Sequence, residues 1–364
     1  MRQSPDKRVP HLGRTIVCTV CVLAMIPVVL WLCKAGYWSG DPFRRLPVVK
    51  PVLLYLPWDY SSKGGIRLSD PSRGIDRQIV LEGMQQANFA PNMLAFTPNG
   101  FDVAIQPASS DHNLSILEYI CVPVQRIITL RVHGIVAGEV GNWGVARLSA
   151  TSRSVLVVVS YNRANGAPVR QRVYKVNPKT GSAQLIPDAA DAQGHCNSPT
   201  YYFVDAHAHL WVQHEGVQRV LLGSVPSNGE LLKWDCDPAH GTVVVNMHRT
   251  VSVYTGSGRR DWTGSGALAS PLMAVPTRPL AVGLAVGEDG TVWAPAVVNH
   301  DLALSPAYYL VDCTVTGKPM ARCTVPGGFI PSWFQPITSK EASFLLSFMK
   351  VSTNLVAMPY STKT

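Results

Sequence analysis

The sequence predicts an all-β fold of repeated small sheets, preceded by one apolar helix that spans a membrane. Three observations predict this class. Residues 15–33 carry no charged side chain. The 29 glycines and 28 prolines are scattered along the whole chain, which suits many short strands joined by turns. From residue 92 onward, an apolar strand, a small turn and a second apolar strand recur.

The apolar segment reads TIVCTVCVLAMIPVVLWLC over residues 15–33. As a helix it would be about 28 Å long, close to the ~30 Å of a bilayer's hydrocarbon core. A helix is expected because backbone groups in lipid must be satisfied internally. A cleaved signal peptide is the alternative, but its apolar core is shorter and small residues precede its cleavage site, whereas Lys34 follows Cys33 here. We therefore expect an uncleaved signal anchor.

Basic residues before the anchor favour a cytoplasmic N-terminus, and they are Arg2, Lys7, Arg8 and Arg14. Residues 1–14 are thus predicted to be a cytoplasmic basic tail. The remainder would lie in the periplasm or outside the cell, held to the lipid bilayer through residues 15–33. Residues 34–52 are rich in proline and glycine and predict a stalk. Residues 53–364 are left for the β domain.

The recurring strand–turn–strand pattern divides this domain. Its instances are residues 92–107, 145–161, 201–213, 232–247, 282–297 and 335–349. Their turns centre on Gly100, Ser154, Ala208, Gly241, Gly290 and Ala342. Most intervals between these turns match one four-stranded unit, and the interval from Ala208 to Gly241 is shorter.

Further strand pairs fill the intervals between these hairpins. They are residues 114–122 with 125–132, and the hairpins predicted over 168–187, 215–234 and 306–325. Each unit therefore offers up to four antiparallel strands. A small sheet of this kind cannot bury both faces alone, so the units must stack against one another.

Two sequence patterns carry a resemblance. Val173–Ile186, VYKVNPKTGSAQLI, resembles the outer hairpin of many β-propeller repeats. Asp205–Trp211 and Glu288–Trp293 are similar to the inner hairpin of bacterial sensor and extracytoplasmic propellers. The resemblance covers roughly residues 90–360 and implies a propeller of six degenerate blades, with seven as the alternative.

The resemblance also implies that the early strand within residues 48–57 completes the last blade and closes the ring. A β-sandwich, or two small β domains, is an alternative that regular strand spacing also fits. Residues 340–350 fit a helix as well as a strand.

The cysteines offer one disulfide candidate that follows from a turn. Cys313 and Cys323 lie equally far from Lys318, so a hairpin centred there would place them opposite each other. Cys196 and Cys236 are a second candidate pair, which would leave Cys121 unpaired. The three cysteines within the apolar segment are interpreted as small apolar filling.

A metal site is one interpretation of the alternating residues Asp205, His207 and His209, because one face of a strand would present all three to Zn²⁺. The alternative is that Asp205 is the carboxylate of a turn. Glu288 and Asp289 are the other acidic groups that a catalytic site would recruit first. No cofactor-binding motif is present, and no cofactor is expected. The net charge of +9 is spread thinly, so no nucleic-acid partner is expected.

These features predict a binding or scaffold module rather than an enzyme. Loops on one face of a rigid ring would contact a protein or glycan partner. The alternative is an extracytoplasmic hydrolase or lyase acting on glycans or peptides at the central channel. No catalytic residue can be assigned from the sequence.

Overall fold

The structure is a computed structural model. It describes residues 43–57, 65–84, 91–105, 114–135, 142–162, 168–214, 216–225, 233–247, 250–262, 284–298, 307–324 and 331–349. The predicted cytoplasmic tail and the predicted anchor at residues 15–33 lie outside this part of the chain. Among the residues it covers, no helix combines the length and the apolar character that crossing a bilayer requires.

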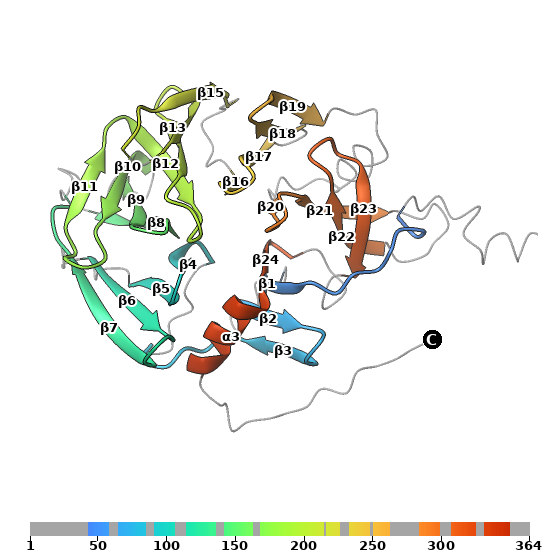
Figure 1. Ribbon diagram of the computed structural model, residues 1–364, viewed down its shortest axis with the longest axis horizontal. Helices are drawn as coiled ribbons and strands as arrows, with labels where there is room; N and C mark the ends of the chain where they lie inside the picture. Colours follow the sequence, from blue (N-terminus) through green and yellow to red (C-terminus); the bar gives the residue numbers. More distant parts are fainter. Residues whose placement is uncertain are drawn as a thin grey trace, which may run out of the picture.

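Six four-stranded antiparallel sheets surround a common centre, which is the six-bladed propeller that the repeats predict (Figure 1). In blades 1 to 5 the strand nearest the axis comes first in the chain and later strands follow outward, whereas the innermost strand of blade 6 comes from the C-terminal end of the ring. Blade 1 holds β4 (Leu94–Thr97), β5 (Gly100–Ile105), β6 (Leu114–Ile120) and β7 (Arg126–Val132); blade 2 holds β8 (Asn142–Ala150), β9 (Val155–Asn162), β10 (Pro168–Val176) and β11 (Ala183–Ile186); blade 3 holds β12 (Ala189–Gly194), β13 (Tyr201–Asp205), β14 (His209–Gln213) and β15 (Val220–Ser224).

The second half of the ring is built in the same way. Blade 4 holds β16 (Lys233–Asp237), β17 (Thr242–Met247), β18 (Thr250–Thr255) and β19 (Gly258–Trp262); blade 5 holds β20 (Ala285–Val286), β21 (Val292–Val298), β22 (Ala307–Cys313) and β23 (Pro319–Thr324); blade 6 holds β24 (Trp333–Ile337), β1 (Val52–Leu56), β2 (Arg67–Asp70) and β3 (Ile75–Gln78). A short 3-10 helix, η1 (Pro91–Met93), leads into blade 1.

Blade 6 closes the ring by joining the two ends of the folded chain. The early strand β1 pairs antiparallel with the late strand β24, with Leu54 opposite Gln335. This confirms that the strand predicted within residues 48–57 completes the last blade. The pairing also shows why residues 335–349 do not form a hairpin: β1 occupies the position beside β24 that a second consecutive strand would have taken.

The hydrophobic core lies between the blades rather than within one layer. Each pair of neighbouring blades shares a cluster of buried side chains, and the central strands contribute to clusters on both of their faces. Strand β13 is consequently buried at all five positions. Outer strands are mostly exposed, as β19 shows. Central strands are therefore rich in apolar residues, whereas outer strands mix polar and apolar residues.

Two predicted hairpins are wrong. Residues 335–349 contain β24 followed by the helix α3 (Ser339–Phe348), which is the helical alternative for residues 340–350. Residues 215–234 contain β15 and the start of β16, which belong to different blades. The interval from Ala208 to Gly241 is short for a related reason. Ala208 lies in the turn between the second and third strands of blade 3, and not in the turn after the innermost strand.

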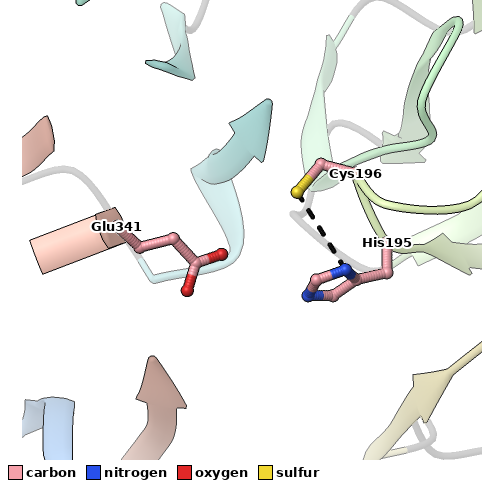
Figure 2. A group of neighbouring side chains, drawn as sticks. All are labelled: His195, Cys196 and Glu341. Atoms are coloured by element: carbon pink, nitrogen blue, oxygen red, sulfur yellow. Dashed lines mark hydrogen bonds between the residues drawn. The ribbon is translucent and has the colours of Figure 1, made fainter. Parts of the chain in front are cut away.

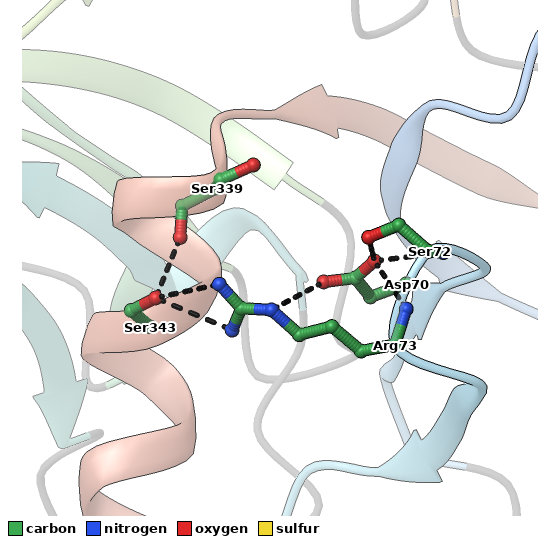
Figure 3. A network of polar contacts seen from close by, with 5 residues as sticks. All are labelled: Asp70, Ser72, Arg73, Ser339 and Ser343. Carbon is green, nitrogen blue, oxygen red and sulfur yellow. Dashed lines mark hydrogen bonds and ion pairs between the residues drawn. The ribbon is translucent and has the colours of Figure 1, made fainter.

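Helix α3 packs over the junction of blades 6 and 1, and Phe348 contacts both Phe101 and Tyr119 edge-on. Polar contacts hold the outer face of α3 to the turn between β2 and β3 (Figure 3). The guanidinium of Arg73 lies 3.3 Å from the carboxylate of Asp70 and donates to Ser343 Oγ at 3.3 Å. Both apolar and polar contacts therefore fix α3 relative to blade 6.

The described part of the predicted stalk packs against blade 5. Phe43 is fully buried beside Tyr309, with ring centroids 6.2 Å apart, on the side of blade 5 that faces blade 4. Val49 packs on the side that faces blade 6. Between them, the backbone follows β23 through bonds from Arg322 N to Pro47 O and from Val49 N to Arg322 O, both 2.9 Å. Residues 43–49 thus form a strap around the outer edge of blade 5.

The predicted disulfide between Cys313 and Cys323 is absent, and all five described cysteines are free thiols. The hairpin of β22 and β23 does form, but its register places Cys323 opposite Leu310 and Cys313 opposite Pro319. The two thiols also lie on opposite faces of blade 5, since Cys313 packs with Phe43 and Cys323 with Phe334. Cys196 and Cys236 are likewise unbridged.

Candidate functional site

The turns that follow the innermost strands gather at one end of the ring. Ser152 N donates to Ser198 O at 2.9 Å, Lys340 Nζ donates to Pro98 O at 3.0 Å, and His195 meets Glu341. We call this end of the ring the inner-turn end. It comprises residues 98–99, 151–154, 195–200, 238–241, 287–291 and 338–341. The last of these is the first turn of α3, which begins where β24 ends. Six separate segments of the chain thus present side chains around one axis.

Three side chains with metal-ligating or nucleophilic atoms meet at this end: His195, Cys196 and Glu341 (Figure 2). One ligand atom from each lies within 4.8 Å of the others. His195 and Cys196 are half-buried, and Glu341 is buried. We call this group the donor cluster. The first two residues come from blade 3 and the third from blade 6, which is the opposite blade of a six-membered ring, so the cluster lies across the axis.

The loop that carries His195 and Cys196 is fixed by backbone bonds. Ser198 N donates to His195 O at 3.0 Å, which closes a turn. Ser152 N, from the turn after β8, donates to Ser198 O at 2.9 Å and ties this turn to the neighbouring blade. The two donor side chains therefore project from a rigid connection rather than from a long loop.

The pKa of His195 depends on burial and on its two partners in the donor cluster. Burial by itself lowers the pKa of His195, but the hydrogen bond to Cys196 and the nearby charge of Glu341 outweigh burial and raise that pKa to about 9. The Nδ1 atom of His195 and the Sγ atom of Cys196 are 4.0 Å apart. The carboxylate of Glu341 thus faces the imidazole of His195 across the axis.

Glu341 is positioned by the way α3 begins. Thr338 is the N-cap, and its side chain accepts a bond from Glu341 N at 3.0 Å. In return, Thr338 N donates to Glu341 Oε2 at 2.9 Å, which completes a capping box. Burial raises the pKa of Glu341, the charge of Glu288 adds to that rise, and the charge of His195 opposes it. The capping box therefore fixes the Glu341 carboxylate through one of its oxygens.

A girdle of polar contacts joins the innermost strands below the cluster. Asp191 on β12 is buried and accepts from Trp234 Nε1 on β16 at 2.7 Å. Arg147 on β8 lies 3.4 Å from the same carboxylate and stacks over the Trp234 ring at 5.5 Å. Burial raises the pKa of Asp191, and the charge of Arg147 opposes that rise. Three consecutive blades are linked through one carboxylate.

Asp235 continues this girdle into blade 5, where its Oδ2 accepts from Val286 N at 2.9 Å. Burial raises the pKa of Asp235 to about 6, against the lowering effect of two backbone hydrogen bonds and of the charges on His195 and Arg147. The electrostatic influence of His195 on Asp235 shows that the donor cluster and the girdle lie near each other.

The sequence-predicted site residues separate onto the two ends of the ring. Asp205, His207 and His209 occupy the turn between β13 and β14, at the end opposite the donor cluster. Asp205 Oδ1 accepts from the backbone of His207 at 2.8 Å and of His209 at 2.9 Å, as the turn-carboxylate interpretation predicts. His207 is exposed. Metal binding by these three residues stays a prediction.

Glu288 and Asp289 do lie at the inner-turn end, in the turn between β20 and β21. Both side chains are exposed, and the charge of Glu288 acts on Glu341. Asp289 Oδ1 accepts from Thr291 N at 3.1 Å and from Thr291 Oγ1 at 2.7 Å, so it shapes its own turn. Sequence reasoning thus found the acidic rim of the site and missed its centre.

Comparisons with known proteins give distant likenesses. A protein of unknown function from Bacteroides caccae is similar to this chain with 13% identity and a TM-score of 0.38, over 79% of this chain and 99% of that one. The WD40 β-propeller domain of Doa1 is similar with 11% identity and a TM-score of 0.38, over 68% of this chain and 72% of that one. No protein-family model matches the sequence. No curated protein matches it either. The sheet topology described above defines the fold.

Proposed function

We propose that this protein is a membrane-anchored, non-enzymatic binding module that recognises a protein or glycan outside the cytoplasm through its inner-turn end. The observation that supports this proposal is the gathering of charged and polar side chains from opposite blades at that end. Rigid inner turns carry them, so a ligand would meet a preorganised surface, which lowers the ordering cost of binding.

The anchor belongs to the proposal because the apolar run of residues 15–33 precedes the folded ring so closely. The strap begins at Phe43, so only residues 34–42 connect anchor and propeller. Such a connection spans at most about 30 Å when fully extended. The propeller would therefore stay within that distance of the bilayer and bind only partners that come equally close to the membrane.

A test of anchoring compares the full chain with a chain that lacks residues 1–34, both expressed with the same C-terminal tag. We expect the full chain in the membrane fraction and resistant to high-salt and carbonate washing. The truncated chain should be soluble and retain a β-rich circular dichroism spectrum. Recovery of the full chain in the soluble fraction would refute the anchor.

A test of recognition uses an immobilised panel of defined oligosaccharides and peptides, probed with the tagged full chain in detergent. Glu288→Gln with Asp289→Asn removes the acidic rim without enlarging any side chain. His207→Ala, at the opposite end, is the matched control. We expect the rim variant to lose at least tenfold in affinity for the ligands that the wild type selects, with the control unchanged. Loss in the control alone, or no selective binding by the wild type, would contradict the proposal.

An extracytoplasmic hydrolase or lyase is the second candidate, because a thiol, an imidazole and a carboxylate are the groups that nucleophilic catalysis uses. His195 Nδ1 and Cys196 Sγ are 4.0 Å apart, which is a long contact for a thiol and its base. That separation favours binding over covalent catalysis. Turnover of any peptide or glycan on the panel that iodoacetamide abolishes would favour the enzyme instead.

A further inference from the structure

We propose that His195, Cys196 and Glu341 form a binding site for a divalent transition-metal ion, with Zn²⁺ as the ion that fits best. The three residues bring one ligand atom each within 4.8 Å, and in the described part of the chain they are the group of three that does so. They come from opposite blades, so a metal would bridge the ring across its axis (Figure 2). This proposal is independent of the protein or glycan ligand considered above.

The types of donor atom select the metal. An imidazole nitrogen, a thiolate and a carboxylate together suit Zn²⁺, which takes nitrogen, sulfur and oxygen ligands. Mg²⁺ and Ca²⁺ prefer sites made of oxygen atoms alone, so a cluster that is two-thirds nitrogen and sulfur disfavours both ions. Three protein ligands leave the fourth tetrahedral position to water or to a ligand that approaches along the axis.

The spacing of the donors is close to what coordination requires. Tetrahedral bonds of roughly 2.0–2.3 Å place two ligand atoms about 3.3–3.6 Å apart. The donor atoms lie within 4.8 Å of one another, so they would reach this spacing if each moved inward by about 1 Å or less. Side-chain rotation of the half-buried His195 and Cys196 supplies this movement without a change in the backbone.

The surroundings of the cluster favour a bound cation and a fixed third ligand. Glu341 Oε2 is already held by Thr338 N at 2.9 Å and by Thr338 Oγ1 at 3.1 Å, so hydrogen bonds from the helix cap orient this carboxylate. Glu288 acts electrostatically on Glu341, and Asp235 lies within the field of His195. Arg147 also acts on Asp235 and opposes this acidic character. Acidic groups thus face the cluster from blades 4 and 5.

The experiment titrates the metal-stripped, reduced full chain in detergent with Co²⁺ under anaerobic conditions. Co²⁺ replaces Zn²⁺ in such sites and reports a bound thiolate through a ligand-to-metal charge-transfer absorption. We expect one equivalent to bind with that absorption, and Zn²⁺ to displace it. Cys196→Ser should abolish the absorption, and His195→Gln should weaken Co²⁺ binding at least tenfold.

Two sets of variants keep the proposal falsifiable. Glutamine can complete a capping box as glutamate does. The helix should therefore remain in Glu341→Gln while the affinity for Co²⁺ falls at least tenfold. Cys121→Ser alters the other half-buried thiol, which contacts Phe344 O of α3, and should bind Co²⁺ like the wild type. His207→Ala tests the opposite end of the ring in the same way.

Three outcomes would overturn the site. The first is wild-type uptake no greater than that of a chain carrying all three donor substitutions. The second is a charge-transfer absorption that survives Cys196→Ser and disappears with Cys121→Ser. The third is Co²⁺ binding that is lost in His207→Ala and retained in Glu341→Gln. Circular dichroism of each variant separates a lost ligand from a lost fold.

Discussion

At the scale of single residues, the buried acids decide where stability depends on pH. Asp102 on β5 is 2% exposed, and its Oδ2 has no hydrogen-bond partner in the described part of the chain. Glu118 on β6 lies directly opposite Asp102 in register. Burial raises the pKa of Asp102 well above its ordinary value, and the charge of Glu118 adds to the rise. Burial and the facing Glu118 therefore favour the neutral form of the Asp102 carboxyl.

Replacing Asp102 by Asn should flatten the dependence of stability on pH. The folded wild type keeps a proton on Asp102 to higher pH than the unfolded chain does. Its free energy of unfolding therefore falls as pH rises from the ordinary carboxyl range through the raised pKa, by up to about 1.4 kcal/mol per pH unit. Asp102→Asn removes this loss, so the variant should gain on the wild type with rising pH in urea unfolding.

The control for that series is Asp261→Asn, which should show the opposite sign. The hydrogen bond from Arg259 holds the pKa of Asp261 below its ordinary value. Stability from Asp261 is thus present above the ordinary carboxyl pKa and lost as pH falls. If the free energies of unfolding of the wild type and of Asp102→Asn changed in parallel over the whole pH range, Asp102 would be ionised in the folded protein.

Single residues also show what sequence reasoning could reach at the site. His195 and Cys196 sit in a polar loop with no motif around them, and Glu341 is separated from them by three blades. Only the ring topology brings them together, so no local spacing could predict the cluster. One signal was present: Thr338-x-x-Glu341 is a capping-box sequence that predicts the start of α3 and the position of that carboxylate.

At the scale of elements, the hairpins predicted for β8–β9, β10–β11 and β22–β23 were correct. Strand β12, with the sequence AADAQG, lacks the apolar run of the other inner strands. The sequence pattern therefore placed the repeated turn of blade 3 after β13, and not after the innermost strand β12. Tertiary packing supplies what strand propensity does not, because Ala189 and Ala192 are buried against blade 2.

The capping box makes a quantitative prediction for α3. Thr338→Ala removes the oxygen that accepts from Glu341 N, so the free energy of unfolding should fall by about 0.5–2 kcal/mol. Thr338→Ser retains that oxygen and should stay close to the wild type. Chemical denaturation of the three proteins at equal pH measures the difference. Equal losses for alanine and serine would show that the methyl group of Thr338, and not its hydroxyl, stabilises the helix start.

The strap makes a second prediction at this scale. Phe43 is fully buried against blade 5, so Phe43→Ala should lower the free energy of unfolding by about 3–5 kcal/mol. Val48 lies in the same strap with 57% of its surface exposed, and Val48→Ala should cost less than about 0.5 kcal/mol. Denaturant unfolding measures both. Similar small effects for the two substitutions would mean that the strap does not contribute to the stability of the ring.

At the scale of the whole molecule, closure of the ring depends on one strand from each end of the described chain. The sequence predicted this closure through resemblance, and it predicted six blades despite two misplaced turns, at Ala208 and Ala342. Exact strand assignment in blade 6 was out of reach because β24 and β1 are separated by nearly the whole fold. Such a non-local pair adds stability only after the other blades have stacked.

Graded C-terminal truncation tests this dependence. A chain that ends after Met349 retains every described contact, so it should unfold cooperatively like the full protein. Ending after Ile337 removes α3, and the midpoint should fall while one transition remains. Ending after Ser332 also removes β24, which exposes Leu54 and the edge of β1 and leaves blades 5 and 6 without their shared cluster around Phe334. We expect that chain to lose its cooperative transition and to regain it when a peptide of residues 331–349 is added. An unclosed propeller leaves one interface between blades unburied, so it should unfold blade by blade from that gap. A cooperative transition without β24 and without the peptide would instead show that the open ring is stable.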